Sequence, residues 1–147
     1  MHIYPIERQQ LDHCVTLFLR VFNSPPWSEA WPRTAATTRL TDLLHTPGFY
    51  GLLASNDKEV LGFAAGYVEQ WDRARHFYLK EMGVVPHHQG QGIGTTLLQV
   101  LGTDLAAAGV GRIYLLTARA SAAEAFYRQR GFYVSPKMIM MGKNLQE

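Results

Sequence analysis

Apolar side chains recur every three or four residues in two stretches of the first third of the chain, which predicts two amphipathic helices. The first is expected over residues 5–22, with Cys14 on its apolar stripe as a small buried side chain. The second is expected from Pro32, whose fixed φ suits a first helical turn, to a stop at Pro47. Prolines between them predict a loop over residues 23–32.

Dense apolar runs bounded by turn residues predict extended strands before and after these two helices. A short strand is expected at residues 2–4. Two longer strands are expected at residues 49–55 and 59–71, joined as a hairpin by an Asn-Asp-Lys turn. Gly62 and Gly66 interrupt the second of these and indicate a bulge or the close approach of another backbone.

A third long strand, residues 77–85, leads into a glycine-rich turn and then a helix. Pro86 ends the strand because proline offers no ladder donor. Apolar residues between Ile93 and Leu105 fall on one helical stripe, and Gly109 is expected to stop that helix. A strand at residues 111–117 then follows at strand–helix–strand spacing. This predicts a parallel pair whose splayed ends open a slot beside the glycine turn.

The last part of the chain predicts one more helix and a closing hairpin. Ser121 is a suitable N-cap, with Glu124 three residues later to complete a capping box, and Gly131 supplies a left-handed stop. Two short strands are expected at residues 132–134 and 138–141, with the methionines of the second on a core face.

Composition predicts one domain, residues 1–147, because 147 residues at 47% hydrophobic content can build one core but not two, and it agrees with a small enzyme. The net charge of +2 comes from scattered basic residues and does not indicate nucleic-acid binding. A single cysteine excludes an intramolecular disulfide and suits a reducing compartment. The N-terminus lacks signal-peptide character and no apolar run approaches about 20 residues, so we expect a cytoplasmic protein without a membrane span.

The turn at residues 87–94 is where the chemistry is expected. Backbone N–H groups and the positive end of a helix dipole converge there, which predicts an anion site, most naturally for phosphate. A P-loop would need a lysine in this turn, and none is present. A dinucleotide fingerprint would need its third glycine where Thr95 stands.

Residues 89–94, Gln-Gly-Gln-Gly-Ile-Gly, resemble the pyrophosphate loop of the GNAT superfamily of acyl-CoA-dependent N-acetyltransferases. The preceding segment, residues 81–86, looks like the family's Glu-x-x-Val-x-Pro strand. Residues 122–132, which end in Tyr-x-x-x-Gly-Phe, are similar to its second signature. Within the superfamily, the tryptophan-rich early loop loosely resembles the aminoglycoside 6′-N-acetyltransferase type.

The resemblance implies an α/β (α+β) fold. This is a mixed, mostly antiparallel central sheet of about seven strands, flanked by about four helices, with a splayed parallel strand pair. It also implies acetyl-CoA as co-substrate, with the pantetheine amides added to the third long strand and the pyrophosphate held by main-chain N–H groups. The residues expected to bind this co-substrate are Met82, Gly83, Val84, Gln89, Gly90, Gln91, Gly92, Ile93, Gly94 and Thr95.

Two residues are the catalytic candidates. Tyr127 matches the family's helix tyrosine and is expected to protonate the leaving thiolate as a general acid. Glu81 is expected to accept the ammonium proton, directly or through water, although it could instead face solvent or pair with a base. Trp27, Glu29 and Trp31 are the candidate substrate contacts, because aromatic walls with a carboxylate suit an ammonium group. In the alternative, the tryptophans only pack the loop onto the core.

The remaining polar candidates are given structural readings. His87 and His88 are expected to end the strand, or else to contact a phosphate. Because adjacent residues rarely ligate one metal and no other histidine stands at ligand spacing, we expect no metal. Glu69 and Asp72 are read as solvated turn residues.

The acceptor is the open question. Ala120 and Leu115 stand where many enzymes acting on protein N-termini carry asparagine and glutamate, which favours a small-molecule amine as acceptor. The alternatives are a protein or peptide N-acetyltransferase, a longer acyl donor, a non-catalytic acyl-CoA sensor or scaffold, and a nucleotide-binding regulator. A homodimer is common in the family.

Overall fold

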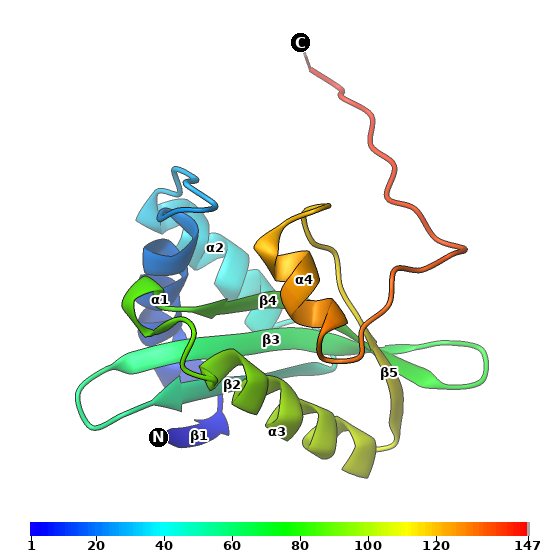
Figure 1. The fold of residues 1–147 in the computed structure, drawn as a ribbon, viewed down its shortest axis with the longest axis horizontal. Coiled ribbons are helices and arrows are strands. Elements are labelled where there is room, and N and C mark those ends of the chain that lie inside the picture. Colours follow the sequence, from blue (N-terminus) through cyan, green and yellow to red (C-terminus); the bar gives the residue numbers. More distant parts are fainter. Residues whose placement is uncertain (147) are drawn as a thin grey trace. The chain divides into compact units, whose positions relative to one another are not determined.

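The computed structural model describes residues 1–146, which form two compact units, Met1–Leu116 and a second that starts at Thr117 (Figure 1). The second unit contains α4 (Ala122–Arg128). The first unit contains, in chain order, β1 (His2–Pro5), η1 (Arg8–Gln10), α1 (Leu11–Phe22), α2 (Arg33–Leu44), β2 (Phe49–Ser55), β3 (Val60–Gln70), β4 (Arg75–Val84), η2 (Pro86–His88), α3 (Ile93–Ala107) and β5 (Val110–Tyr114). No helix within residues 1–146 combines the length and apolarity needed to cross a membrane.

The strands lie across the sheet in sequence order, β1-β2-β3-β4-β5. All neighbours are antiparallel except β4 and β5, which are parallel as the strand–helix–strand spacing predicted. Their pairing starts at Arg75 and ends where Tyr78 faces Tyr114. From Leu79 onward, this edge of β4 has no strand neighbour within residues 1–146, so a stretch of β-strand backbone next to the glycine turn is left open.

A bulge between β3 and β4 sets which side chains share a face. Ala65 faces Glu81 but the next residue, Gly66, faces Leu79, so the pairing skips Lys80. A Cβ at Gly66 would lie 1.8 Å from the carbonyl oxygen of Tyr78, which is why this position requires glycine. The bulge confirms the irregularity expected at Gly66.

Gly66→Val should lower the free energy of unfolding by about 3 kcal/mol, because the added side chain must push β4 away at the bulge. Gly102→Ala is the matched control, since a Cβ on this α3 residue meets nothing within 4 Å and should add up to about 1 kcal/mol of helix stability. Urea unfolding measures both. Parental stability in Gly66→Val would contradict the bulge geometry.

Helices cover both faces of the sheet in the first unit (Figure 1). On one face, α1 and α2 form a core with Phe63 and Ala65 of β3. On the other face lies α3, whose Leu97 packs over Gly62. Cys14 is 4% exposed within the α1 core, and burial raises the pKa of its thiol to about 12. The expectation of a small buried side chain is therefore confirmed at Cys14.

The sheet has five strands within residues 1–146, so the expected seven are too many. The expected strands at residues 132–134 and 138–141 are not formed. Met138, Met140 and Met141 are 65–83% exposed rather than on a core face. The alternating pattern there gives only a tendency to extend, and a lone hairpin without a surface to cover is marginal in water.

Several element bounds also differ from the pattern. Pro5 pairs with Leu52 at the end of β1, so the first helix begins only at Leu11, after a 3-10 turn in which Glu7 and Gln10 cap each other. β5 ends at Tyr114 rather than at residue 117, because its pairing with β4 ends there. Hydrophobic spacing locates a strand well but does not fix where its neighbour stops pairing.

Candidate active site

The glycine turn takes a conformation that its glycines make accessible. It follows η2 and leads into α3, with Gly90 at φ +78° and Gly92 at φ +84°. A Cβ on either residue would meet nothing within 4 Å. The left-handed backbone therefore favours glycine at both positions. The absence of side chains also leaves the backbone of the turn accessible to a ligand.

The backbone donors of this turn are unused. Within residues 1–146, no acceptor receives a hydrogen bond from the backbone N–H groups of residues 90–94, and the first helical bond of α3 runs from Thr96 N to Gly92 O. The positive end of the α3 dipole lies at the same point. An arrangement of this kind binds an anion such as a phosphate group through main-chain N–H groups.

Side chains of the turn brace it instead of covering it. The Gln89 side-chain amide donates to the carbonyl oxygen of Val84 at 3.0 Å, which ties the turn to the end of β4. The Gln91 Oε1 lies 3.1 Å from His88 Nδ1. Ile93 is buried and Thr95 lies in the first turn of α3.

Met82, Gly83 and Val84 lie on the part of β4 that β5 leaves unpaired. Their partners on β3 are Ala64, Phe63 and Gly62, so one side of this backbone is satisfied within the sheet. The other side is open to an extended chain of amides, which could add to it as a strand does. At Gly83, a Cβ would come within 2.7 Å of Val21, so glycine also lets α1 pack closely here.

Glu81 is 5% exposed and forms an ion pair with Arg39 of α2, whose Nε lies 2.5 Å from the Glu81 Oε1. Burial raises the pKa of the Glu81 carboxyl, and Arg39 partly opposes that rise. Of the alternatives open for Glu81, facing solvent is wrong and pairing with a base is confirmed.

Arg39 is a site residue that sequence reasoning missed. It occupies the same face of α2 as Ala36 and Leu43, both of which are buried. An arginine on the buried face of a helix requires an anionic partner, and that pattern was the available signal.

The three candidate substrate contacts have different surroundings. The Trp31 ring lies 5.4 Å from the Arg39 guanidinium, and its Nε1 donates to Glu29 at 3.0 Å. Trp31 and Glu29 are thus linked to Glu81 through Arg39. Trp31 also packs edge-on against Phe18, at 5.0 Å between ring centroids. Trp27 packs against Phe22 at 5.8 Å, the loop-packing role that was its alternative.

An aromatic surface with one carboxylate lies on the same face of the sheet as Glu81. Ala65 is the β3 partner of Glu81, and Tyr67 lies two residues further along β3, so its side chain is on that face. Tyr78 stacks on Tyr114 at 4.9 Å and meets Tyr67 edge-on at 5.6 Å. We call Tyr67, Glu69, Tyr78 and Tyr114 the tyrosine surface.

Glu69 is the charged member of this surface. Its Oε1 accepts the Tyr114 hydroxyl at 2.6 Å and the Trp71 indole N–H at 3.4 Å. Burial and this hydrogen bond raise the pKa of the Tyr114 phenol, which therefore stays the donor. The reading of Glu69 as a solvated turn residue is wrong, because β3 continues to Gln70 and holds it on the sheet.

Tyr127 lies in the second unit, in the last turn of α4. Ser121 caps this helix by accepting from the Glu124 N–H at 3.1 Å, as predicted, and Gly131 follows at φ +92°. The Tyr127 ring packs against Phe126 and Phe132, at 5.3 and 5.4 Å between centroids. Burial raises the pKa of its phenol to about 12, so the hydroxyl is protonated at neutral pH.

Comparisons with solved structures find this fold in acetyltransferases. A probable acetyltransferase shares 19% identity with a TM-score of 0.81, over 100% of this chain and 99% of its own. An aminoglycoside acetyltransferase from an uncultured soil metagenomic sample, in complex with sisomicin, shares 19% at 0.76, over 99% and 96%. The aminoglycoside N-acetyltransferase AAC(6′)-Iy, in complex with CoA, shares 16% at 0.75, over 97% and 93%. At these identities the likeness concerns the fold.

The family comparison is independent of these structures. No curated protein matches the chain. The model of the acetyltransferase (GNAT) family matches residues 16–132, a span that includes the open edge of β4, the glycine turn and α4. Because this match covers most of the sequence, the chain belongs to the GNAT family of acetyltransferases.

Proposed function

We propose that the protein transfers the acetyl group of acetyl-CoA to a primary amine of a small cationic molecule. The observation that carries this proposal is the row of unused backbone N–H groups at residues 90–94, beside the open edge of β4. The first suits the diphosphate of coenzyme A, and the second suits the amides of its pantetheine arm. The CoA complex among the structures of the same fold supports this choice of ligand.

The acceptor would bind over the tyrosine surface. Three tyrosine rings and the Glu69 carboxylate offer cation–π contacts and a charge partner to an ammonium group. Glu29 and Trp31 add a second carboxylate and ring near Arg39. The solved structure with sisomicin, an aminoglycoside complex of the same fold, supports a small polyamine as acceptor.

The chemistry needs two protons removed from the acceptor nitrogen and one supplied to the leaving thiolate. The ammonium group of the acceptor loses a proton to Glu81, directly or through water, and its nitrogen attacks the thioester carbonyl carbon. An N–H of the open β4 edge would polarise the carbonyl oxygen. As the C–N bond forms, the C–S bond breaks and the thiolate takes a proton from Tyr127. The nitrogen then gives up its second proton, which restores the Tyr127 hydroxyl, so the products are an amide, free coenzyme A and the proton held by Glu81. A pKa raised by burial makes Glu81 a stronger base than an exposed carboxylate.

A thiol-release assay tests the proposed function. The protein is mixed with acetyl-CoA and, in separate reactions, aminoglycosides, linear polyamines or a peptide with a free N-terminus. We expect thiol release with small polyamines and none with the peptide. Release with the peptide alone would assign a peptide acetyltransferase. Binding of CoA without release with any amine would assign a non-catalytic acyl-CoA sensor.

Glu69→Gln should raise the KM for a cationic acceptor by about tenfold, because the change removes the charge but keeps an acceptor for Tyr114. The affinity for acetyl-CoA should not change. Asp12→Asn, which removes an exposed charge from α1, is the control and should leave both constants unchanged. Steady-state kinetics with each substrate varied in turn measures this, and an unchanged acceptor KM in Glu69→Gln would remove Glu69 from the acceptor site.

A further inference from the structure

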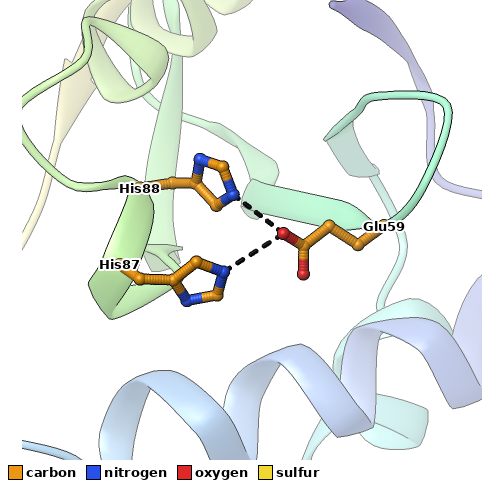
Figure 2. A group of neighbouring side chains, drawn as sticks. All are labelled: Glu59, His87 and His88. Atoms are coloured by element: carbon orange, nitrogen blue, oxygen red, sulfur yellow. Dashed lines mark hydrogen bonds and ion pairs between the residues drawn. The ribbon is translucent and has the colours of Figure 1, made fainter.

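Three side chains that could bind a metal converge beside the glycine turn. Glu59 lies directly before β3, and His87 and His88 lie on η2 (Figure 2). The Glu59 Oε1 is 3.1 Å from His87 Nε2 and 2.8 Å from His88 Nε2. The ligating atoms of all three residues lie within 4.8 Å of one another.

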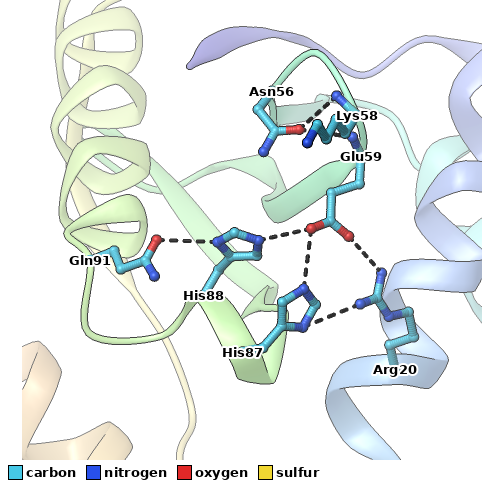
Figure 3. A network of polar contacts seen from close by, with 7 residues as sticks. All are labelled: Arg20, Asn56, Lys58, Glu59, His87, His88 and Gln91. Atoms are coloured by element: carbon cyan, nitrogen blue, oxygen red, sulfur yellow. Dashed lines mark hydrogen bonds and ion pairs between the residues drawn. The ribbon is translucent and has the colours of Figure 1, made fainter.

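The contact made by His88 Nδ1 bears on whether Nε2, the nitrogen that faces Glu59, carries a proton or a lone pair. Its Nδ1 faces Gln91 Oε1 at 3.1 Å (Figure 3). An amide oxygen only accepts, so this contact favours the ring tautomer that carries its proton on Nδ1. In a neutral ring, the Nε2 lone pair then points at a carboxylate oxygen 2.8 Å away. A metal ion between these two atoms would be bound by both lone pairs, in the place that an N–H on Nε2 takes in the other ring tautomer.

The carboxylate is held in place by its own turn. The Asn56 Oδ1 accepts from the backbone N–H groups of Lys58 and Glu59, both at 2.8 Å, which fixes the link between β2 and β3 (Figure 3). The ligand atoms are therefore presented by two short, constrained segments.

We propose that Glu59, His87 and His88 form a binding site for one divalent transition-metal ion of the zinc type. Zinc bonds of about 2.0–2.2 Å in a tetrahedral arrangement separate two ligand atoms by about 3.3 Å. The two distances from Glu59 Oε1 to the histidine Nε2 atoms, 2.8 and 3.1 Å, need to widen by only a few tenths of an ångström. Two histidines and a carboxylate leave the fourth position to water. Gln91, on the far nitrogen of His88, is the outer hydrogen-bond partner that a metal-bound histidine commonly has.

Arg20 limits the affinity of the proposed site for a metal ion. Its guanidinium lies 3.4 Å from Glu59 Oε2 and 3.5 Å from His87 Nδ1 (Figure 3). Metal binding frees the His87 Nε2 for the ion and moves the ring proton to Nδ1, so His87 exchanges its contact with Arg20 for the metal. The nearby positive charge also repels the ion. We therefore expect micromolar rather than nanomolar binding.

The proposed site departs from the expectation of no metal drawn from sequence. That expectation rested on the rarity of adjacent ligands and on the lack of a third histidine nearby. The third ligand is a glutamate 28 residues before His87, and the β2–β3 turn brings it to the histidines. The spacing of residues along the chain does not reveal that Glu59 and the two histidines meet. The proposal is independent of the acetyl-transfer function.

The test is metal titration of the tag-free 147-residue chain after chelation and dialysis. Co²⁺ is the optical probe, because tetrahedral coordination gives intense visible bands, and calorimetry with Zn²⁺ gives the stoichiometry. We expect one equivalent to bind. His88→Gln and Glu59→Gln should each weaken binding at least about tenfold, while His13→Gln, which changes an exposed histidine of α1, should not.

Two results would overturn the site. One is no binding by the parent protein at sub-millimolar Zn²⁺. The other is equal binding by the parent, His88→Gln and Glu59→Gln, which would mean that the ion sits elsewhere. Circular dichroism of each variant establishes that it is folded, and because Glu59 and His88 are only half-buried, both substitutions should be tolerated.

Discussion

Gly92→Val should weaken the binding of coenzyme A at least about 100-fold. The valine side chain would stand above the turn where the diphosphate is expected, and φ +84° at this position disfavours any residue with a Cβ. The loss of two charge-assisted hydrogen bonds corresponds to about 3 kcal/mol, which is a factor of this size. Calorimetric titration with coenzyme A measures the effect.

Gly109→Val separates strain from ligand contact. Gly109 has φ +83°, almost the value of Gly92, but it follows the opposite end of α3. This variant should lose comparable stability on thermal unfolding and bind coenzyme A as the parent does. If Gly92→Val kept parental affinity, the coenzyme would not use this turn.

Tyr127→Phe should lower kcat by about 100-fold, the scale of a lost general acid, with little change in coenzyme A affinity. The ring packing against Phe126 and Phe132 is retained, so the fold should not change. With a phenol pKa of about 12, the parent enzyme should also show no loss of rate from Tyr127 ionisation below about pH 10. Steady-state kinetics across this pH range is the measurement.

Tyr133→Phe is the matched control for Tyr127→Phe. Tyr133 lies in the same unit and is 66% exposed, so its hydroxyl should contribute nothing to turnover. An unaltered kcat in Tyr127→Phe, or an equal loss in both variants, would end the assignment of Tyr127 as the acid.

The parts of the fold that were predictable are those with local causes. The hairpin of β2 and β3 follows from two apolar runs around an Asn-Asp-Lys turn, and the parallel pair follows from the length of the segment between β4 and β5. The glycine turn was predictable for the same reason, because a left-handed backbone at Gly90 and Gly92 requires the residue type itself.

The parts that were not predictable depend on contacts between distant residues. Arg39 meets Glu81 across 42 positions, and Tyr114 meets Glu69 across 45. Glu59 reaches His87 only because β2 and β3 turn back beside η2. At residues 132–141 the alternating pattern was present, but without a neighbouring strand it forms no sheet.

A crystal structure with coenzyme A tests the anion site at residues 90–94 most directly. We expect diphosphate oxygens within about 3 Å of several of these backbone nitrogens, and the pantetheine arm alongside Met82 to Val84. A diphosphate bound away from this turn would contradict the proposed function, and so would N–H groups that already donate to acceptors of the protein itself.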